Sequence, residues 1–454
     1  MLNLDNTFVL QLLLIVGLYL IYQRLYLIYK LSHDLLFFSL SLIVSFSLWY
    51  VLPILLSNCG YIDIFSTSLS IDLTLEKFNK YALFEIYSYY IVLKFYTKIS
   101  NYRIRTKYRI VSNGKKIKKI ERVFIIYSII GCLLNLFAMK NYSSLNDISN
   151  ANNGLSFLGI FISSYLSSYY CANIFCFSES TRNKIFILIL VVNNLVSVFI
   201  GARIYLLFFV WLYVMNKWKY IYMKKYLRFF SPLIVLLISF SLLLPILAEK
   251  RADNESSINK SIVVDLALFH MNLKLNSIAY STVLIEKDGI GYAGMTPYVG
   301  SLLKFVPRLL WTEKPTPLSC DGSVEGMPSR RIPRLAGFSN LDESNVGTTA
   351  FIVSLWHGWL GYIITILLNV FYLFTITKLF LSNPFFLKAI GIYLLVFPQL
   401  ISTPNSGDYL LQRLLEIPIY LFLLIVIGAI KVIKNNNSIK EESIYVSTQI
   451  KTKI

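Results

Sequence analysis

Basic and aromatic side chains gather in a polar stretch at residues 261–361, which lies between two long apolar regions. Its densest part is KFVPRLLWTEKP at 304–315, which contains Arg308, Trp311 and Lys314. Guanidinium and ammonium groups bind phosphate oxygens through charge-assisted hydrogen bonds, and a guanidinium keeps its proton. Tryptophan near basic residues is also typical of a membrane interface. The pattern therefore indicates either a site for a phosphate-bearing ligand or an anchor at the membrane surface.

Further arginines extend this basic character. Arg330, Arg331 and Arg334 follow in the run RRIPR, which either attracts an anionic lipid or substrate or forms a solvated loop. Arg203 follows Gly201 at a break between two apolar segments, where an unpaired arginine costs roughly 2.5–3.5 kcal/mol on insertion scales. We expect Arg203 to bind an anion; the alternative is an arginine that reaches the interface and only stabilises a helical hairpin.

Groups that exchange protons are scarcer. His357 lies in SLWHGWLGY, between Trp356 and Gly358 and inside an expected membrane helix. It is either a packing residue or a general base that borders a cavity. Asp408 and Arg413 stand at the outer end of the last apolar segment, where their spacing allows an ion pair.

Several motifs of nucleotide and metal chemistry are absent from the sequence. There is no GxxxxGK[ST] loop for ATP, no GxSxG or HExxH motif, and no Asp-x-Asp pair. The five cysteines show no metal-ligand spacing. We therefore expect neither a cofactor nor a metal ion. A reaction on this face then needs an activated donor, of which a lipid-linked pyrophosphate sugar is one.

The composition predicts a membrane protein. The 454 residues are 56% hydrophobic and 15% charged, with a mean hydropathy of +0.61, and this excludes an ordinary soluble domain. We attribute the net charge of +19 to cytoplasmic loops that set the orientation, and we expect no nucleic-acid partner.

We predict an all-α polytopic protein with about eleven membrane spans. Two basic loops, 98–122 with ten Lys or Arg and 216–230 with five, belong in the cytoplasm by the positive-inside rule. Alternation then puts the N-terminus outside. The spans are expected at residues 7–29, 35–57, 81–97, 123–139, 155–177, 185–200, 203–216, 231–248, 348–377, 387–403 and 412–432.

The expected organisation has four parts. Residues 1–248 hold the first eight spans, and residues 249–347 form one large outer loop with an amphipathic helix at 262–280. Residues 348–432 hold the last three spans, and residues 433–454 form a disordered cytoplasmic tail. Because long ordered loops are usually functional, we expect the outer loop to carry the activity.

Several short elements together resemble the bacterial oligosaccharide repeat-unit polymerases, the Wzy-type O-antigen and capsule polymerases. The family's Pro-Arg-x-x-Trp-x-x-Lys-Pro run is similar to residues 307–315, although a proline that usually follows the tryptophan is Thr312 here. The other elements are Gly291-Tyr292, Tyr298, the break Gly201-Ala202-Arg203, and LWHGWLG at 355–361. The resemblance implies a GT-C-like polymerase or ligase architecture in the bacterial inner membrane, with a periplasmic active face.

The resemblance also implies a reaction. The growing glycan would pass from undecaprenyl pyrophosphate to a hydroxyl of a new lipid-linked repeat unit. Arg203, Arg308 and Lys314, with Arg413 behind them, would stabilise the departing pyrophosphate. His357 is a candidate base from its own surroundings, not from the family. The remaining expected substrate contacts are Tyr298, Trp311, Arg330, Arg331 and Arg334.

Two alternatives remain open. An O-antigen ligase uses the same donor and passes the glycan to a lipid A core. A lipid-linked oligosaccharide flippase usually has twelve or more spans and no such long outer loop. Besides the lipid-linked oligosaccharide, the expected partners are membrane lipids, a chain-length regulator and the flippase of the same pathway.

Overall fold

The computed structural model describes part of the chain. Arg203, Arg308 and the basic loop at 216–230 lie outside the described residues, as does most of the expected amphipathic helix at 262–280. The described residues are 6–31, 43, 51, 75–100, 108–112, 277–278, 280–303, 306, 310–311, 313–316, 319–323, 326–335, 348–380, 387, 407–426, 428 and 430–434.

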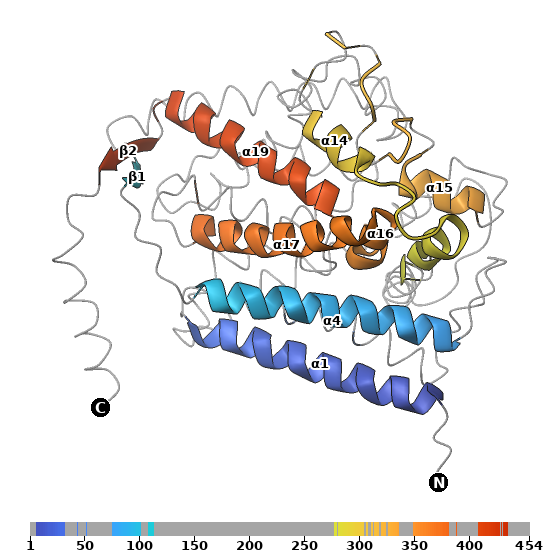
Figure 1. The fold of residues 1–454 in the computed structure, drawn as a ribbon. Coiled ribbons are helices and arrows are strands. Elements are labelled where there is room, and N and C mark those ends of the chain that lie inside the picture. Colours follow the sequence, from blue (N-terminus) through green and yellow to red (C-terminus); the bar gives the residue numbers. More distant parts are fainter. Residues whose placement is uncertain are drawn as a thin grey trace, which may run out of the picture.

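Four long helices in the described part of the chain lie side by side (Figure 1). They are stacked in the order α1 (Asn6–Leu31), α4 (Leu75–Ser100), α17 (Gly358–Phe380) and α19 (Gly407–Val426). On α4 and α17, the hydroxyls of Ser88 and Tyr362 are 2.9 Å apart, and those of Tyr96 and Thr377, further along both helices, are 2.8 Å apart. The two helices therefore run in the same direction.

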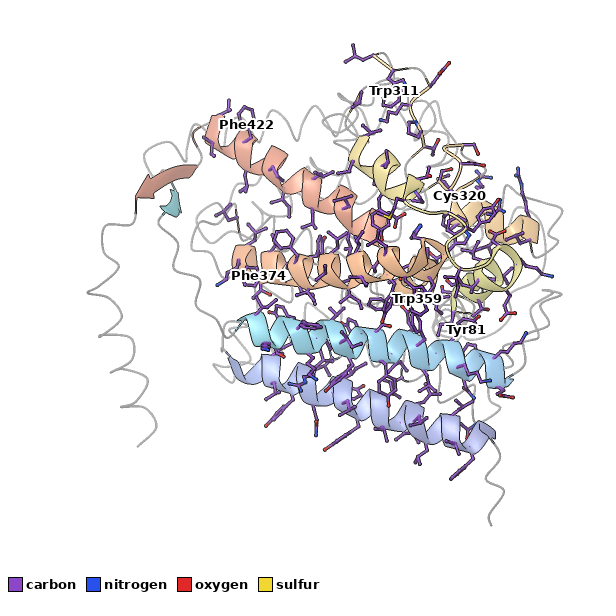
Figure 2. The ribbon with its side chains drawn as sticks, in the orientation of Figure 1. Tyr81, Trp311, Cys320, Trp359, Phe374 and Phe422 are labelled. Carbon is purple, nitrogen blue, oxygen red and sulfur yellow. The ribbon has the colours of Figure 1, made fainter. Side chains whose placement is uncertain are left out.

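The other two helices share this direction (Figure 1). We call the end at which the four helices begin the N-terminal end of the bundle. Figure 2 shows Tyr81 and Trp359 toward this end, and Phe374 and Phe422 toward the opposite end. These four helices correspond to the expected first, third, ninth and eleventh spans. Because successive spans cross a membrane in alternating directions, odd-numbered spans must share one direction. The other expected spans lie mostly outside the described residues, so their number is not tested.

The first helix has a buried face and an exposed apolar face. Leu14, Ile21 and Leu25 recur at helical spacing and are buried against α4. Gly17 allows a close approach, because a Cβ there would lie 2.9 Å from Cγ2 of Ile86. The exposed face is apolar as well, and carries Phe8, Leu12, Ile15 and Tyr19. Among the described residues, two helical segments are long and apolar enough to cross a membrane: Phe8–Ile28 and Gly358–Leu379.

The expected ninth span, 348–377, is not one helix, and this corrects the sequence prediction. It is divided into α16 (Ala350–Trp356) and α17 by a turn at His357. Gly358 has φ +88° there, a conformation that L-residues with a Cβ rarely adopt. The turn also lies close to another backbone, since a Cβ on Gly358 would be 3.5 Å from Cα of Gly291. His357 thus lies at a helix break rather than in the middle of a helix.

The described structure is helical apart from one pair of short strands. β1 (Tyr108–Ser112) and β2 (Ile430–Lys434) pair antiparallel, with Ile110 opposite Val432. The prediction was all-α and extended the last span to residue 432, but α19 ends at Val426. The sequence IKVIK alternates apolar and basic residues and contains β-branched side chains, which favours a strand.

This pairing constrains the topology. Backbone hydrogen bonds join β1, in the basic loop at 98–122, to β2, at the start of the C-terminal tail. Both segments therefore lie on one side of any membrane, at the end of the bundle opposite α16 (Figure 1). The prediction that both are cytoplasmic requires such a common side.

The expected outer loop contributes three short helical elements toward the N-terminal end of the bundle (Figure 1). Residues 280–288 are helical, α14 is Thr296–Leu302 and α15 is Pro328–Leu335. Residues 277, 278 and 280, at the end of the expected helix at 262–280, are helical too, and this helical stretch continues to residue 288. A turn at 289–295 links it to α14, and three of its glycines have positive φ.

Candidate functional site

His357 and Asp408 form a buried pair where four helices meet. His357 lies between α16 and α17, and Asp408 lies in the first turn of α19. Nε2 of His357 is 3.9 Å from Oδ2 of Asp408, and the exposed fractions of the two side chains are 0% and 2%. The rings of Tyr298, on α14, and Trp356 lie beside the imidazole, at centroid distances of 5.3 and 5.7 Å.

The polar atoms of this pair are incompletely satisfied. Within the described residues, neither ring nitrogen of His357 makes a hydrogen bond of good geometry, although the Gly294 backbone approaches the ring, and Oδ1 of Asp408 has no hydrogen-bond partner. Most buried polar atoms in proteins are paired, and an unpaired one costs about 1–3 kcal/mol. Such atoms indicate a place where a proton, a water molecule or a ligand group is accommodated. The arrangement is therefore suited to proton transfer.

Tyr298 hydrogen-bonds to α17 directly beside the pair. Its hydroxyl donates to the carbonyl of Gly361 at 3.0 Å and lies 2.9 Å from Oγ1 of Thr365. The backbone N–H of Gly407 donates to the same Thr365 oxygen at 3.2 Å. A Cβ on Gly407 would lie 2.6 Å from both hydroxyl oxygens, so only glycine fits. The Tyr298 hydroxyl is thus engaged by protein groups, and its contact with substrate stays a prediction.

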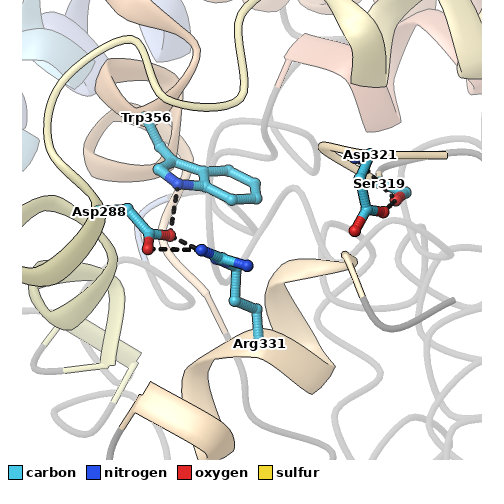
Figure 3. Close-up of polar contacts among 5 residues, drawn as sticks. All are labelled: Asp288, Ser319, Asp321, Arg331 and Trp356. Atoms are coloured by element: carbon cyan, nitrogen blue, oxygen red, sulfur yellow. Dashed lines mark hydrogen bonds and ion pairs between the residues drawn. The ribbon is translucent and has the colours of Figure 1, made fainter. Parts of the chain in front are cut away.

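A second polar cluster contacts the other end of Trp356 (Figure 3). Arg331, on α15, binds Asp288 through Nε at 2.5 Å and Nη2 at 2.7 Å, and the Trp356 indole N–H donates to Asp288 at 3.0 Å. The Arg331 guanidinium also lies 4.5 Å from the centroid of the Tyr292 ring. Hydrogen bonding to Asp288 raises the pKa of Arg331 above its already high value. Arg331 is therefore a fixed cation whose charge Asp288 balances.

A turn built on Asp321 precedes α15 (Figure 3). One carboxylate oxygen accepts hydrogen bonds from the Ser319 hydroxyl at 2.8 Å and from the Ser323 hydroxyl and N–H at 2.7 and 2.9 Å. Hydrogen bonding by Ser323 and Ser319 lowers the pKa of Asp321. Gly326 closes this turn without a side chain, because a Cβ there would lie 2.1 Å from Asp321 Oδ1. The turn is a structural element that directs the chain into α15.

Lys314 and Trp311 have different environments within the basic-aromatic run. Lys314 is buried, and its ammonium group donates to the Val306 carbonyl at 2.7 Å, which closes the loop between them. Trp311 is 40% exposed and its neighbour Leu310 is 78% exposed. Figure 2 places Trp311 at the edge of the molecule. Arg308 belongs to the same loop but lies outside the described residues.

The remaining basic candidates are spread over two elements. Arg330 is half-buried and Arg334 is exposed, both on α15. Arg413 lies in α19, and its side chain is outside the described part. The expected Asp408–Arg413 pair is likewise outside it. Arg203 is not described. The structure thus brings Arg331 close to Trp356, through Asp288, and Tyr298 against His357.

Sequence reasoning missed two buried carboxylates. Asp288 binds Trp356 across 68 positions of the chain, and no local pattern pairs them. Glu85, on α4, is fully buried, and its carboxylate accepts hydrogen bonds from the N–H groups of Ala350, Phe351 and Ile352 at 3.1–3.4 Å. Glu85 thereby caps the N-terminus of α16. The signal available in the sequence was a carboxylate inside an expected membrane span, which requires a buried partner.

No family model, curated protein or solved structure matches this chain.

Proposed function

We propose that this protein is an oligosaccharide repeat-unit polymerase of the bacterial inner membrane. It transfers a glycan from undecaprenyl pyrophosphate to a hydroxyl of a second lipid-linked repeat unit, at the periplasmic face. The observation that carries the proposal is the His357–Asp408 pair. It supplies a buried base toward the same end of the bundle as the helices of the basic and aromatic stretch.

The chemistry matches these groups. The acceptor oxygen bonds to the anomeric carbon of the donor while its proton passes to His357. The bond from that carbon to the pyrophosphate oxygen breaks, and undecaprenyl pyrophosphate departs with the electron pair. Fixed cations stabilise the charge that develops on the leaving group. We assign this role to Arg203, Arg308, Lys314 and Arg413.

The other basic residues have supporting roles in this proposal. Arg330 and Arg334 attract the anionic donor, because charge on an accessible surface raises its local concentration. Arg331, which is paired with Asp288, holds Trp356 in place and contacts substrate only through donors that Asp288 leaves unused. Trp311, partly exposed, packs on a sugar or a lipid. Membrane lipids surround the apolar helices, and a chain-length regulator and a flippase are its partners in the pathway.

A gene deletion tests this function. A strain without the protein should carry single repeat units on its surface in place of the polymer ladder, and the wild-type gene should restore the ladder. A cell without any surface glycan, in which lipid-linked units accumulate inside, would identify a flippase instead.

Reconstitution separates polymerase from ligase. Purified protein in liposomes receives the lipid-linked repeat unit alone, or together with a lipid A core acceptor. Under the proposal, polymer forms from the repeat unit alone. A product that forms only when the core is present would assign the ligase activity.

A further inference from the structure

The structure places a carboxylate where it can control the candidate base. Asp408 is the described carboxylate that contacts His357, and it approaches Nε2 rather than Nδ1. Both side chains are buried, so water screens their interaction little. An imidazole has one protonated nitrogen when it is neutral, and its environment decides which one.

We propose that Asp408 is the positioning residue of His357: it orients the N–H of Nε2 toward itself and leaves the Nδ1 lone pair to accept the acceptor hydroxyl's proton. At 3.9 Å the Nε2–Oδ2 contact is longer than a hydrogen bond, so it acts through electrostatic attraction until the ring moves slightly closer. Once Nδ1 takes the proton, the imidazolium faces a carboxylate across this short gap. The negative charge then stabilises the protonated ring.

The Gly294 backbone also interacts with the imidazole, but Asp408 is the one charged side chain in the described part of the chain that contacts it. Tyr298 meets the imidazole with its ring, and its hydroxyl is engaged by Gly361 and Thr365. Asp288 binds Trp356 and Arg331. Nδ1 makes no hydrogen bond of good geometry among the described residues, as expected of a proton acceptor awaiting its donor.

The imidazole is covered in this conformation, which restricts its access. The turn at 289–295 is bound to the end of α16 by two hydrogen bonds, from Gly291 N–H to the Leu355 carbonyl and from Ala293 N–H to the Trp356 carbonyl, both 3.0 Å long. The side chain of His357 has no exposed surface, and Tyr298 and Trp356 also lie against its ring. A substrate hydroxyl therefore reaches Nδ1 only after some of the groups that cover the ring move.

The proposal rests on the polymerase function for its reaction. One test, of the histidine tautomer, does not depend on that function. Nitrogen-15 NMR of the full-length protein labelled at histidine distinguishes the two tautomers. The signal of His357, identified by its loss in His357→Ala, should be that of the Nε2-protonated ring. In Asp408→Asn, a mixture of tautomers should appear. A wild-type ring protonated at Nδ1, or a tautomer unaffected by Asp408→Asn, would overturn the proposal whatever the enzyme does.

The catalytic test is a double-mutant cycle on the reconstituted enzyme. General-base catalysis contributes about 10²–10⁴-fold, so His357→Ala should lower kcat by that order. Asp408→Asn should lower kcat at least tenfold with little change in KM. In the His357→Ala background, Asp408→Asn should have less than a twofold effect, because its partner is gone. Asp408→Glu should recover part of the rate.

Equal effects of Asp408→Asn with and without His357 would show a merely structural role and overturn the proposal, as would an unchanged kcat. Thermal unfolding of each variant checks that it folds. If Asp408→Asn does not fold, Asp408→Ser, which also removes the charge, takes its place in the cycle and in the NMR measurement, with the same criteria. A wild-type protein that makes no polymer would refute the polymerase function and leave the NMR result to decide the tautomer.

Discussion

At the scale of single residues, the structure depends on buried charges whose partners come from other elements. Asp288 is 4% exposed at its side chain and is matched by Arg331, which is 22% exposed. Glu85 accepts hydrogen bonds from three backbone N–H groups. Removing either partner from such an arrangement leaves an uncompensated charge or uncompensated donors, which costs far more than losing a surface contact.

We expect Arg331→Ala to lower the free energy of unfolding by about 3–5 kcal/mol, because Asp288 would remain as a buried, unpaired carboxylate. Tryptophan fluorescence during denaturation in detergent measures it. Arg334→Ala, an exposed position on the same helix, is the matched control and should change stability by less than about 0.5 kcal/mol. Similar losses in both variants would contradict the structural importance of the Asp288 pair.

Glu85→Gln removes the charge that caps α16 while preserving the size of the side chain. Hydrogen bonds to a charged group contribute about 1.5–3 kcal/mol, and we expect a loss of that order in the unfolding free energy. Glu76→Gln on the same helix is the control, since Glu76 is 42% exposed and pairs with the exposed Lys80. The prediction fails if the two substitutions are equally mild.

At the scale of elements, α14, α17 and α19 approach one another closely at Gly407. Gly407 faces the hydroxyls of Tyr298 and Thr365, and a methyl group there forces one of the helices to shift. Protein interiors are packed densely, so an added carbon atom is not absorbed without strain.

Gly407→Ala should therefore destabilise the protein by about 1–3 kcal/mol. Tyr298→Phe removes one of the two oxygens that the new methyl meets. The double variant should consequently be more stable than the sum of the two single losses predicts, which a thermodynamic cycle of the four proteins measures. Strict additivity would indicate that Gly407 does not touch Tyr298.

At the scale of the whole molecule, the strand pair and the outer elements lie at opposite ends of one parallel set of helices (Figure 1). From the positive-inside rule we expect the strand end, with the basic loop at 98–122, to lie in the cytoplasm. The elements of the 249–347 stretch lie toward the other end, and so does the candidate site.

Reporter fusions check this orientation. Alkaline phosphatase joined after Lys314 should be active, because it folds only in the periplasm, whereas the same reporter after Lys434 should be inactive. A cytoplasmic reporter should show the reverse pattern at both positions. Activity of one reporter at both sites would contradict the arrangement, because Lys314 and Lys434 are expected on opposite faces.

Part of the fold follows from local sequence. The apolar runs predicted helices at α1 and α17, because length and hydropathy alone decide whether a helix can cross a bilayer. Helix ends were less predictable: α4 begins at Leu75 rather than residue 81, and α19 ends at Val426 rather than 432. Polar residues continue α4 because neighbouring elements bind them, as Glu286 binds Lys77 and Tyr81. Hydropathy does not register such contacts.

The sequence by itself determined the long apolar helices, the position of the basic and aromatic stretch, and His357 as a candidate base, because composition and residue type are local properties. Tertiary structure decided the rest of the described site. The helix break at His357 depends on a glycine conformation and on the backbone at Gly291. The approach of Asp408 to His357, and of Asp288 to Arg331, joins residues from separate elements. Only the packing of helices brings such groups within reach, so no spacing along the chain predicts it.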